Sequence, residues 1–315
     1  MELFPNGGFV RLRSRARDKY VHADEDARGV SLRPLGAAPS VNAVWKAEHW
    51  PVEGGDAFFL LQGAAYGRYL AVSQSYRPDA PPGHRGVRAV QRDYNSPHLE
   101  APFVWMPHRV EPGQNYVRLH NDHRCLRANG RHRYWNNVVT VDARNGSRTT
   151  MMQWRVEAIP LSPEPLPLPP PPQPPIHVSR GLFKRWAKVY PYPGRMIRHV
   201  RMSDDGSIIH DNWPEFSFYD YSVSNLRTEV AARQDDENIT LCVRAGIYGL
   251  VIPLITDLPN NVDTMDIIVI TTGSPGENSA TFAVVCAALY VLLTISACAM
   301  FNVLSGNASV DCNAT

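Results

Sequence analysis

The first 160 residues repeat one pattern three times, and this repetition constrains the fold more than any other feature of the chain. Each copy has an apolar-alternating strand, a polar turn, a strand of basic, aromatic and aliphatic residues, a variable stretch and a tryptophan. Each unit is too small to bury its own apolar face. Three units are therefore expected to pack together and to close an all-β barrel.

Alternation within the strands predicts which residues enter the barrel. In the first copy Val10 and Leu12 fall on one face of a strand, and Arg11 and Arg13 fall on the other. In the second strand of the third copy, Cys125 takes the place of the aromatic residue. The predicted repeat core is Tyr20, Tyr69, Trp45, Trp105 and Trp154.

The repeated basic-aromatic-aliphatic strand followed by a tryptophan strand resembles fascin-type actin-crosslinking β-trefoils. A closer resemblance is to DUF569, a plant family defined by a domain of unknown function, through residues 1–26, 65–71, 126–131 and 151–154. The resemblance covers residues 1–160 and, in the second half, 194–270. It implies a fascin-like β-trefoil and a link to actin, but the family itself has no settled activity.

Composition divides the chain into four parts. Residues 1–159 form the predicted trefoil, and residues 160–193 form a linker that is first Pro-rich and then basic. Ten of the sixteen residues from 160 to 175 are proline, which predicts an extended spacer. Residues 194–272 are predicted to be a small α+β, ubiquitin-like domain, and 273–315 form a tail.

The second domain is predicted from its own local signals. Ser222 can cap a helix whose buried face carries Val223, Leu226 and Val230. The other predicted elements are a strand at 196–200, a hairpin turn at Asp204-Asp205-Gly206, a hairpin formed by 241–244 and 250–255, and a final strand at 265–270. This acidic domain would serve as an interaction module for a protein partner that the sequence does not identify.

The net charge of +2 conceals an uneven distribution. Residues 1–159 carry 22 Lys/Arg against 15 Asp/Glu, residues 160–203 carry 7 against 1, and residues 204–315 carry 3 against 14. Either the basic first half attracts anionic partners, or the opposite charges of the two halves merely balance each other and affect only the solubility of the chain. The basic and aromatic residues of 180–201 could dock on an anionic membrane or on nucleic acid, but the entry to a strand explains them more simply. No nucleic-acid partner is expected.

The tail contains 23 residues without a charge, 282–304, which are long enough for a transmembrane helix. Either this segment anchors the chain in a membrane, or it is an artefact in the prediction of the protein sequence. The first residues lack the features of a signal peptide, and the five cysteines show no paired spacing. The expected localisation is cytoplasmic, with a candidate tail anchor to a membrane.

No catalytic motif stands out in the sequence. A Gly-rich phosphate loop, a nucleophile elbow and a zinc-protease motif are all missing. His120, Asp122 and His123 are close enough in sequence to ligate a metal, but a hairpin turn explains them more simply. We therefore expect no enzymatic activity, no metal and no cofactor.

The leading functional hypothesis is a binding scaffold that contacts actin filaments or another acidic surface. The arginines assigned to this contact are Arg11, Arg13, Arg15, Arg17, Arg127, Arg131 and Arg133. One alternative is a carbohydrate-binding trefoil that uses an exposed aromatic residue such as Tyr66, Tyr134 or Trp135. The other alternative is a membrane-tethered protein-interaction adaptor.

Overall fold

The structure is a computed structural model of the chain. It describes residues 3–36, 40–50, 58–74, 85–111, 114–129, 137–143, 149–160, 194–203, 205, 207–208 and 213–274.

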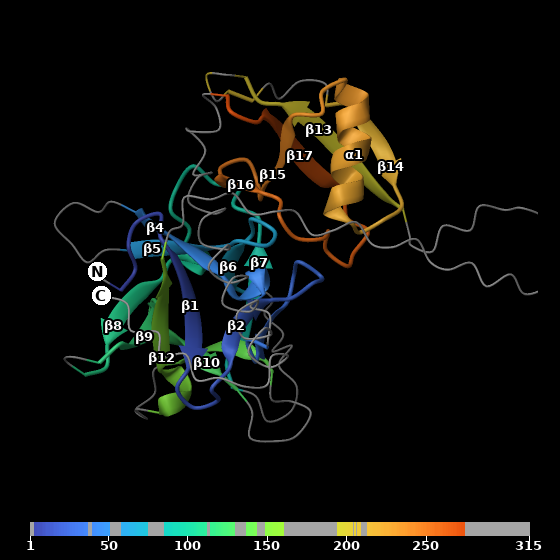
Figure 1. The fold of residues 1–315 in the computed structure, drawn as a ribbon. Helices are drawn as coiled ribbons and strands as arrows, with labels where there is room; N and C mark the ends of the chain where they lie inside the picture. Colours follow the sequence, from blue (N-terminus) through green and yellow to red (C-terminus); the bar gives the residue numbers. More distant parts are fainter. Residues whose placement is uncertain are drawn as a thin grey trace, which may run out of the picture.

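The first domain consists of three copies of the same unit, each with three strands, a short 3₁₀ turn and a fourth strand (Figure 1). The 3₁₀ turns span Val41–Ala43, Ala101–Phe103 and Thr150–Met152. The strands are β1 (Phe9–Ser14), β2 (Tyr20–Ala23), β3 (Val30–Arg33), β4 (Trp45–Trp50), β5 (Phe58–Gly63), β6 (Tyr69–Val72), β7 (Val87–Arg92), β8 (Met106–Arg109), β9 (Tyr116–Asn121), β10 (Arg124–Ala128), β11 (Val139–Ala143) and β12 (Trp154–Ile159).

The first and last strands of the three copies close a barrel. Strand β1 pairs with both β12 and β4, β4 pairs with β5, and β9 pairs with β8 and β12. A bridge between Phe59 and Trp105 joins β5 to the residue that precedes β8, and this bridge completes the ring. The remaining hairpins, β2–β3, β6–β7 and β10–β11, contact one another across one end of the barrel. This closure is the β-trefoil expected from the repeats.

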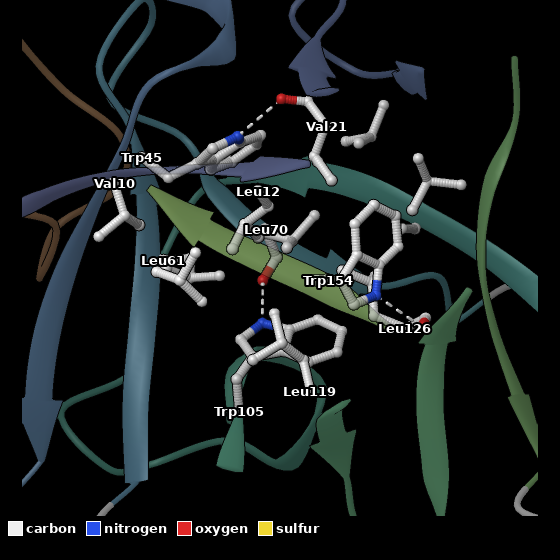
Figure 2. Close-up of a cluster of buried hydrophobic side chains, with 14 of the residues drawn as sticks. Val10, Leu12, Val21, Trp45, Leu61, Leu70, Trp105, Leu119, Leu126 and Trp154 are labelled. Atoms are coloured by element: carbon white, nitrogen blue, oxygen red, sulfur yellow. Dashed lines mark hydrogen bonds between the residues drawn. The ribbon is translucent and has the colours of Figure 1, made fainter. Parts of the chain in front are cut away.

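The three repeat tryptophans have the same environment in the core (Figure 2). All three are fully buried, and each follows its 3₁₀ turn after one intervening residue. Their indole nitrogens donate to the backbone oxygens of Val21, Leu70 and Leu126, at 3.1, 3.0 and 3.0 Å. Burial and a satisfied N–H in each copy make these residues structural.

The second domain is a five-stranded sheet with one helix across one face (Figure 1). Its elements are β13 (Arg195–Arg201), β14 (Glu215–Phe218), α1 (Val223–Gln234), β15 (Ile239–Arg244), β16 (Val251–Pro253) and β17 (Met265–Thr271). The strand order is β14-β13-β17-β15-β16, with β13 and β17 parallel and the other pairs antiparallel. This arrangement confirms the prediction of a ubiquitin-like α+β domain.

The predicted helix forms as its local signals indicated. The Ser222 side chain accepts a hydrogen bond from Asn225 N and so caps the N-terminus. Val223, Leu226 and Val230 are fully buried and belong to the core between the helix and the sheet. In the predicted turn at 204–206, Asp204 and Gly206 lie outside the described residues.

Of the predicted linker at 160–193 and the predicted tail at 273–315, residues 161–193 and 275–315 also lie outside the described residues. The candidate span 282–304 lies among them. Within the part of the chain that the structure describes, no helix is long and apolar enough to span a membrane.

Candidate functional site

Three arginines meet on the outer face of the trefoil, where β1, β12 and β9 lie side by side. The strand register places Arg13 directly opposite Arg155, and Arg155 directly opposite Tyr116. Like charges that face each other across a strand pair destabilise a sheet. Glu157, 3.6 Å from Arg13, offsets part of this repulsion.

Arg15 completes the cluster from the turn after β1. Its Nη1 donates to Gln153 Oε1 at 2.8 Å, and its guanidinium lies 4.7 Å from the centre of the Tyr116 ring. A pocket of about 240 Å³ opens between these groups. We call it the arginine pocket; its lining residues are Arg13, Ser14, Arg15, Asp18, Tyr116 and Arg155.

The arginine pocket carries an excess of positive charge. Arg13 forms an ion pair with Asp18 at 2.6 Å, and this hydrogen bond raises the pKa of Arg13 and lowers that of Asp18. Arg155 is exposed and forms no ion pair with a described residue. The Ser14 hydroxyl is buried at the pocket and has no hydrogen-bond partner among the described atoms. Two uncompensated cations and an unused hydroxyl are suited to an anionic group.

The two domains are joined by hydrogen bonds to the loop between β15 and β16. Tyr94 binds this loop twice: its N donates to Ala245 O at 2.9 Å, and its O accepts from Tyr248 N at 3.1 Å. Ile247 N donates to Asn95 Oδ1 at 3.0 Å. The trefoil therefore binds the backbone of this loop through three hydrogen bonds.

The same loop also contacts the barrel strands. Leu250 N donates to the Tyr69 hydroxyl at 3.1 Å, and Leu250 O accepts from Gln62 Nε2 at 2.9 Å. After β16, Ile255 also packs against an apolar cluster that contains Phe9 and Ile159. The core tyrosine of the second copy therefore takes part in docking the second domain.

A second set of contacts involves the acidic turn at residues 24–26. Asp26 Oδ1 accepts from the backbone of Arg28, and Asp26 O accepts from Asn261 Nδ2 at 2.9 Å. Arg28 forms a bidentate ion pair with Asp263, with both distances at 2.8 Å. The acidic residues form a turn, and this turn also binds the second domain.

Between the two sets of contacts lies a cleft of about 660 Å³. We call it the interdomain cleft. The trefoil contributes Tyr66, Arg68, Asp93 and Asn95, whereas the second domain contributes residues of β13, β15 and β17 and of the adjoining loops.

Two family models match the chain. The beta-trefoil domain of unknown function (DUF569) matches residues 1–156, and the DUF569 associated ubiquitin-like domain matches residues 193–270. The chain belongs to the DUF569 family. The two matches fall on the two folded domains, so the domain that docks onto the trefoil in this DUF569 protein is the one associated with the family.

Solved structures similar to this DUF569 protein align with about half of the chain. A ricin B-like lectin from Macrolepiota procera, in complex with lactose, is 18% identical over 48% of this chain and 96% of its own, with a TM-score of 0.36. The designed three-fold symmetric protein ThreeFoil is 20% identical over 47% and 97%, with a TM-score of 0.35. An SDF2-like protein from Arabidopsis thaliana is 14% identical over 49% and 94%, with a TM-score of 0.38. Likenesses this distant identify no ligand, and no curated protein matches the chain.

The predicted binding arginines of the DUF569 protein fall into separate groups. Arg13 and Arg15 line the arginine pocket, and Arg17 lies in the turn beside them. Arg11 faces Glu157 across the strand pair, and burial lowers its pKa. Arg127 lies on β10, where its side chain is 14% exposed and 3.6 Å from Asp142. Arg131 and Arg133 lie outside the described residues.

Sequence reasoning missed Arg155, Tyr116 and Ser14. A signal for Arg155 was available, because the last strand of a closed three-fold barrel must pair with the first. The residue after Trp154 therefore lies close to the arginines of β1.

The prediction that Tyr66 is an exposed aromatic residue is wrong. Tyr66 is 7% exposed and its hydroxyl accepts from Asn42 Nδ2 at 3.3 Å. It lies at the interdomain cleft, next to residues that contact the second domain. The other two candidate sugar-binding aromatics, Tyr134 and Trp135, lie outside the described residues.

The candidate metal ligands are arranged as a hairpin turn. Asp122 adopts a left-handed backbone conformation in this turn and pairs with the neighbouring His123, whereas the His120 ring lies 4.2 Å from that of His108. Throughout the described ranges, no group of three or more His, Cys, Asp or Glu residues could hold a metal ion. Cys125 and Cys242 are buried in different domains.

A buried carboxyl group lies where the domains meet. Burial raises the pKa of Glu48 to about 7, and the Tyr69 hydroxyl donates to Glu48 Oε1 at 3.1 Å. Lys46 lies two residues away on the same strand, and burial lowers its pKa. These groups line a hollow of about 590 Å³ together with Trp50 and Leu250.

The contribution of Glu48 to the stability of the chain should therefore fall with rising pH. Folding favours the protonated form of Glu48, so its contribution is fully present below the ordinary pKa of 4.5 and is lost as the pH rises through about 7. We expect Glu48→Gln to raise the free energy of unfolding by about 2 kcal/mol near pH ~8 and to change it little near pH ~4. Urea unfolding at both pH values measures this difference. A change of equal size at the two values would contradict the role of Glu48.

Proposed function

We propose that this DUF569 protein is a non-enzymatic binding scaffold whose trefoil contacts an acidic surface through the arginine pocket. The observation that supports this proposal is the pairing of Arg13 with Arg155 across β1 and β12, next to the unused Ser14 hydroxyl. Actin filaments are the first partner to test, because the repeats resemble those of fascin-type proteins and actin presents an acidic surface.

The chemistry of the arginine pocket suits carboxylate groups. A guanidinium presents a planar fork of donors that can bind both oxygens of a carboxylate. Arg155 has this fork available, and Arg15 is held in position by Gln153 and Tyr116. Because the groups lie at the surface, added salt should screen the attraction.

Co-sedimentation of the full chain with filamentous actin tests the proposal. The test variant is Arg13→Ser/Arg15→Ser/Arg155→Ser. The matched control is Arg85→Ser/Arg88→Ser/Arg124→Ser, which removes the same charge from trefoil residues that do not line the pocket. We expect the test variant to bind at least about tenfold more weakly at low salt, a loss of about 1.4 kcal/mol, and the control to bind like the parent.

Near-physiological salt should weaken the binding of the parent protein. Far-ultraviolet circular dichroism verifies that both variants are folded. If the parent fails to pellet with actin at either salt concentration, or if both variants lose binding equally, this function is excluded for the arginine pocket.

The hollow beside Glu48 supports a second candidate, a carbohydrate site. Trp50 offers an aromatic face there, and Asn6, Lys46 and Glu48 offer polar groups. A neutral sugar would bind without salt dependence, and Trp50→Ala would abolish that binding. The two candidates therefore differ in how binding responds to salt and in which substitution weakens it.

A further inference from the structure

Five of the eight charged residues that line the interdomain cleft form ion pairs. Arg198 forms a bidentate ion pair with Asp266, with both distances at 2.7 Å. Arg68 Nε lies 2.9 Å from Asp93. Asp263 is bound by Arg28 of the trefoil. These pairs neutralise three of the carboxylates that line the cleft.

Two further charged residues of the cleft are also accounted for. Arg195 is 3% exposed and donates to the backbone oxygens of Pro259 and Asn261. Glu215 is exposed at the rim and faces Arg198 across the strand pair. Neither residue leaves an unbound charge inside the cleft.

Arg244, at the end of β15, is the exception. It is half-buried, and it has neither an ion pair nor a hydrogen bond from its side chain to any described residue. Burial lowers its pKa, and only the charge of Asp266 acts in the opposite direction. An unpaired cation in a partly desolvated position lowers the stability of the fold. The presence of Arg244 here therefore points to a role other than stability.

The surroundings of Arg244 indicate what could bind. Trp213 supplies apolar surface in the cleft, and Ala245 and Ile247 of the docked loop lie beside it. The volume of about 660 Å³ falls in the range that holds small organic ligands. Because the trefoil fixes the β15–β16 loop, the cleft is complete only when both domains are docked.

We propose that the interdomain cleft binds a small molecule with one anionic group, a carboxylate or a phosphate, attached to an apolar ring. The anionic group accepts hydrogen bonds from the Arg244 guanidinium, which can bind two oxygens at once. The ring lies along Trp213. This site is separate from the arginine pocket and independent of the actin proposal, because the two share no residue.

Calorimetric titration of the full chain tests the proposal with three probes of similar shape. Phenylacetate carries a carboxylate, phenyl phosphate carries a phosphate, and phenylacetamide is neutral. We expect one or both anions to bind at least about tenfold more tightly than the amide. The order of the two anions identifies the anionic group that the cleft prefers.

Variants locate the binding and separate it from stability. Arg244→Gln should weaken anion binding by at least about tenfold, whereas Arg88→Gln on the trefoil should bind like the parent. Without ligand, Arg244→Gln should melt at the same temperature as the parent or higher, because it removes an unpaired cation. A purely structural arginine would give the opposite shift.

Four results would overturn the proposal. They are failure of both anions to bind the parent, equal binding of the amide, equal binding by Arg244→Gln, and a lower melting temperature of ligand-free Arg244→Gln. The triple variant Arg13→Ser/Arg15→Ser/Arg155→Ser should keep full anion binding, so failure at the arginine pocket is distinguishable from failure at the cleft.

Discussion

Replacement of Trp105 by alanine is expected to lower the free energy of unfolding by about 3–5 kcal/mol. The side chain is fully buried in the barrel core, which also contains Phe59 and Leu61. The substitution would leave a cavity and would also leave the Leu70 carbonyl without its 3.0 Å hydrogen bond (Figure 2). Because a domain is typically stable by only about 5–15 kcal/mol, this loss brings the trefoil close to unfolding.

Two companion variants separate the contributions at this position. Trp105→Phe keeps much of the apolar volume but not the N–H donor, and we expect a smaller loss of about 1–3 kcal/mol. Trp50→Ala removes a half-buried tryptophan on β4, with an expected loss below about 1.5 kcal/mol. Urea unfolding followed by circular dichroism measures all three variants. Equal losses at Trp50 and Trp105 would contradict the assignment of Trp105 to the core.

Gly246→Ala is expected to separate the two domains while each stays folded. Gly246 has a φ of +86°, and a Cβ added there would overlap the backbone oxygen of Tyr94. That oxygen cannot move away freely, because it accepts the hydrogen bond from Tyr248 N. The clash therefore disrupts the backbone hydrogen bonds that join the domains. The left-handed backbone conformation of an alanine at this position adds roughly 1 kcal/mol of strain.

Gly273 provides a matched control for this substitution. Its φ of +82° is nearly the same, but a Cβ added there would have no described atom within 4 Å. Small-angle scattering should show a larger radius of gyration for Gly246→Ala than for the parent and an unchanged radius for Gly273→Ala. Identical behaviour of the two variants would mean that the β15–β16 loop does not hold the domains together.

Local patterns predicted most elements within each domain. The alternation around Val10 and Leu12 and the cap at Ser222 depend on residues close in sequence, so the elements could be read without tertiary information. Domain docking could not be predicted in this way. Its hydrogen bonds join distant residues, such as Asn95 and Ile247, which are 152 positions apart. Tyr66 is buried against Ala27 and Ala65 of the trefoil, a tertiary contact that alternation within one strand does not reveal.

The candidate binding site was predictable only in part. Alternation placed Arg13 on the outer face, but the sequence also suggested Arg127, whose guanidinium lies 3.6 Å from Asp142 of β11. Only the pairing of β1 with β12 identifies Arg155 as the partner of Arg13. The position of a surface charge cluster depends on how the strands are paired. A single sequence indicates this register less directly than it indicates which residues are buried.

Hydrogen exchange in the β15–β16 loop tests most directly the central claim that the two domains form one docked unit. The Ile247, Tyr248 and Leu250 side chains are 61%, 49% and 40% exposed, yet their backbone N–H groups donate to Asn95, Tyr94 and Tyr69 of the trefoil. We predict slow exchange at these three amides in the full chain and fast exchange in the isolated fragment 194–274, with β17 protected in both as the control. Fast exchange of the three amides in the full chain would contradict the docked arrangement.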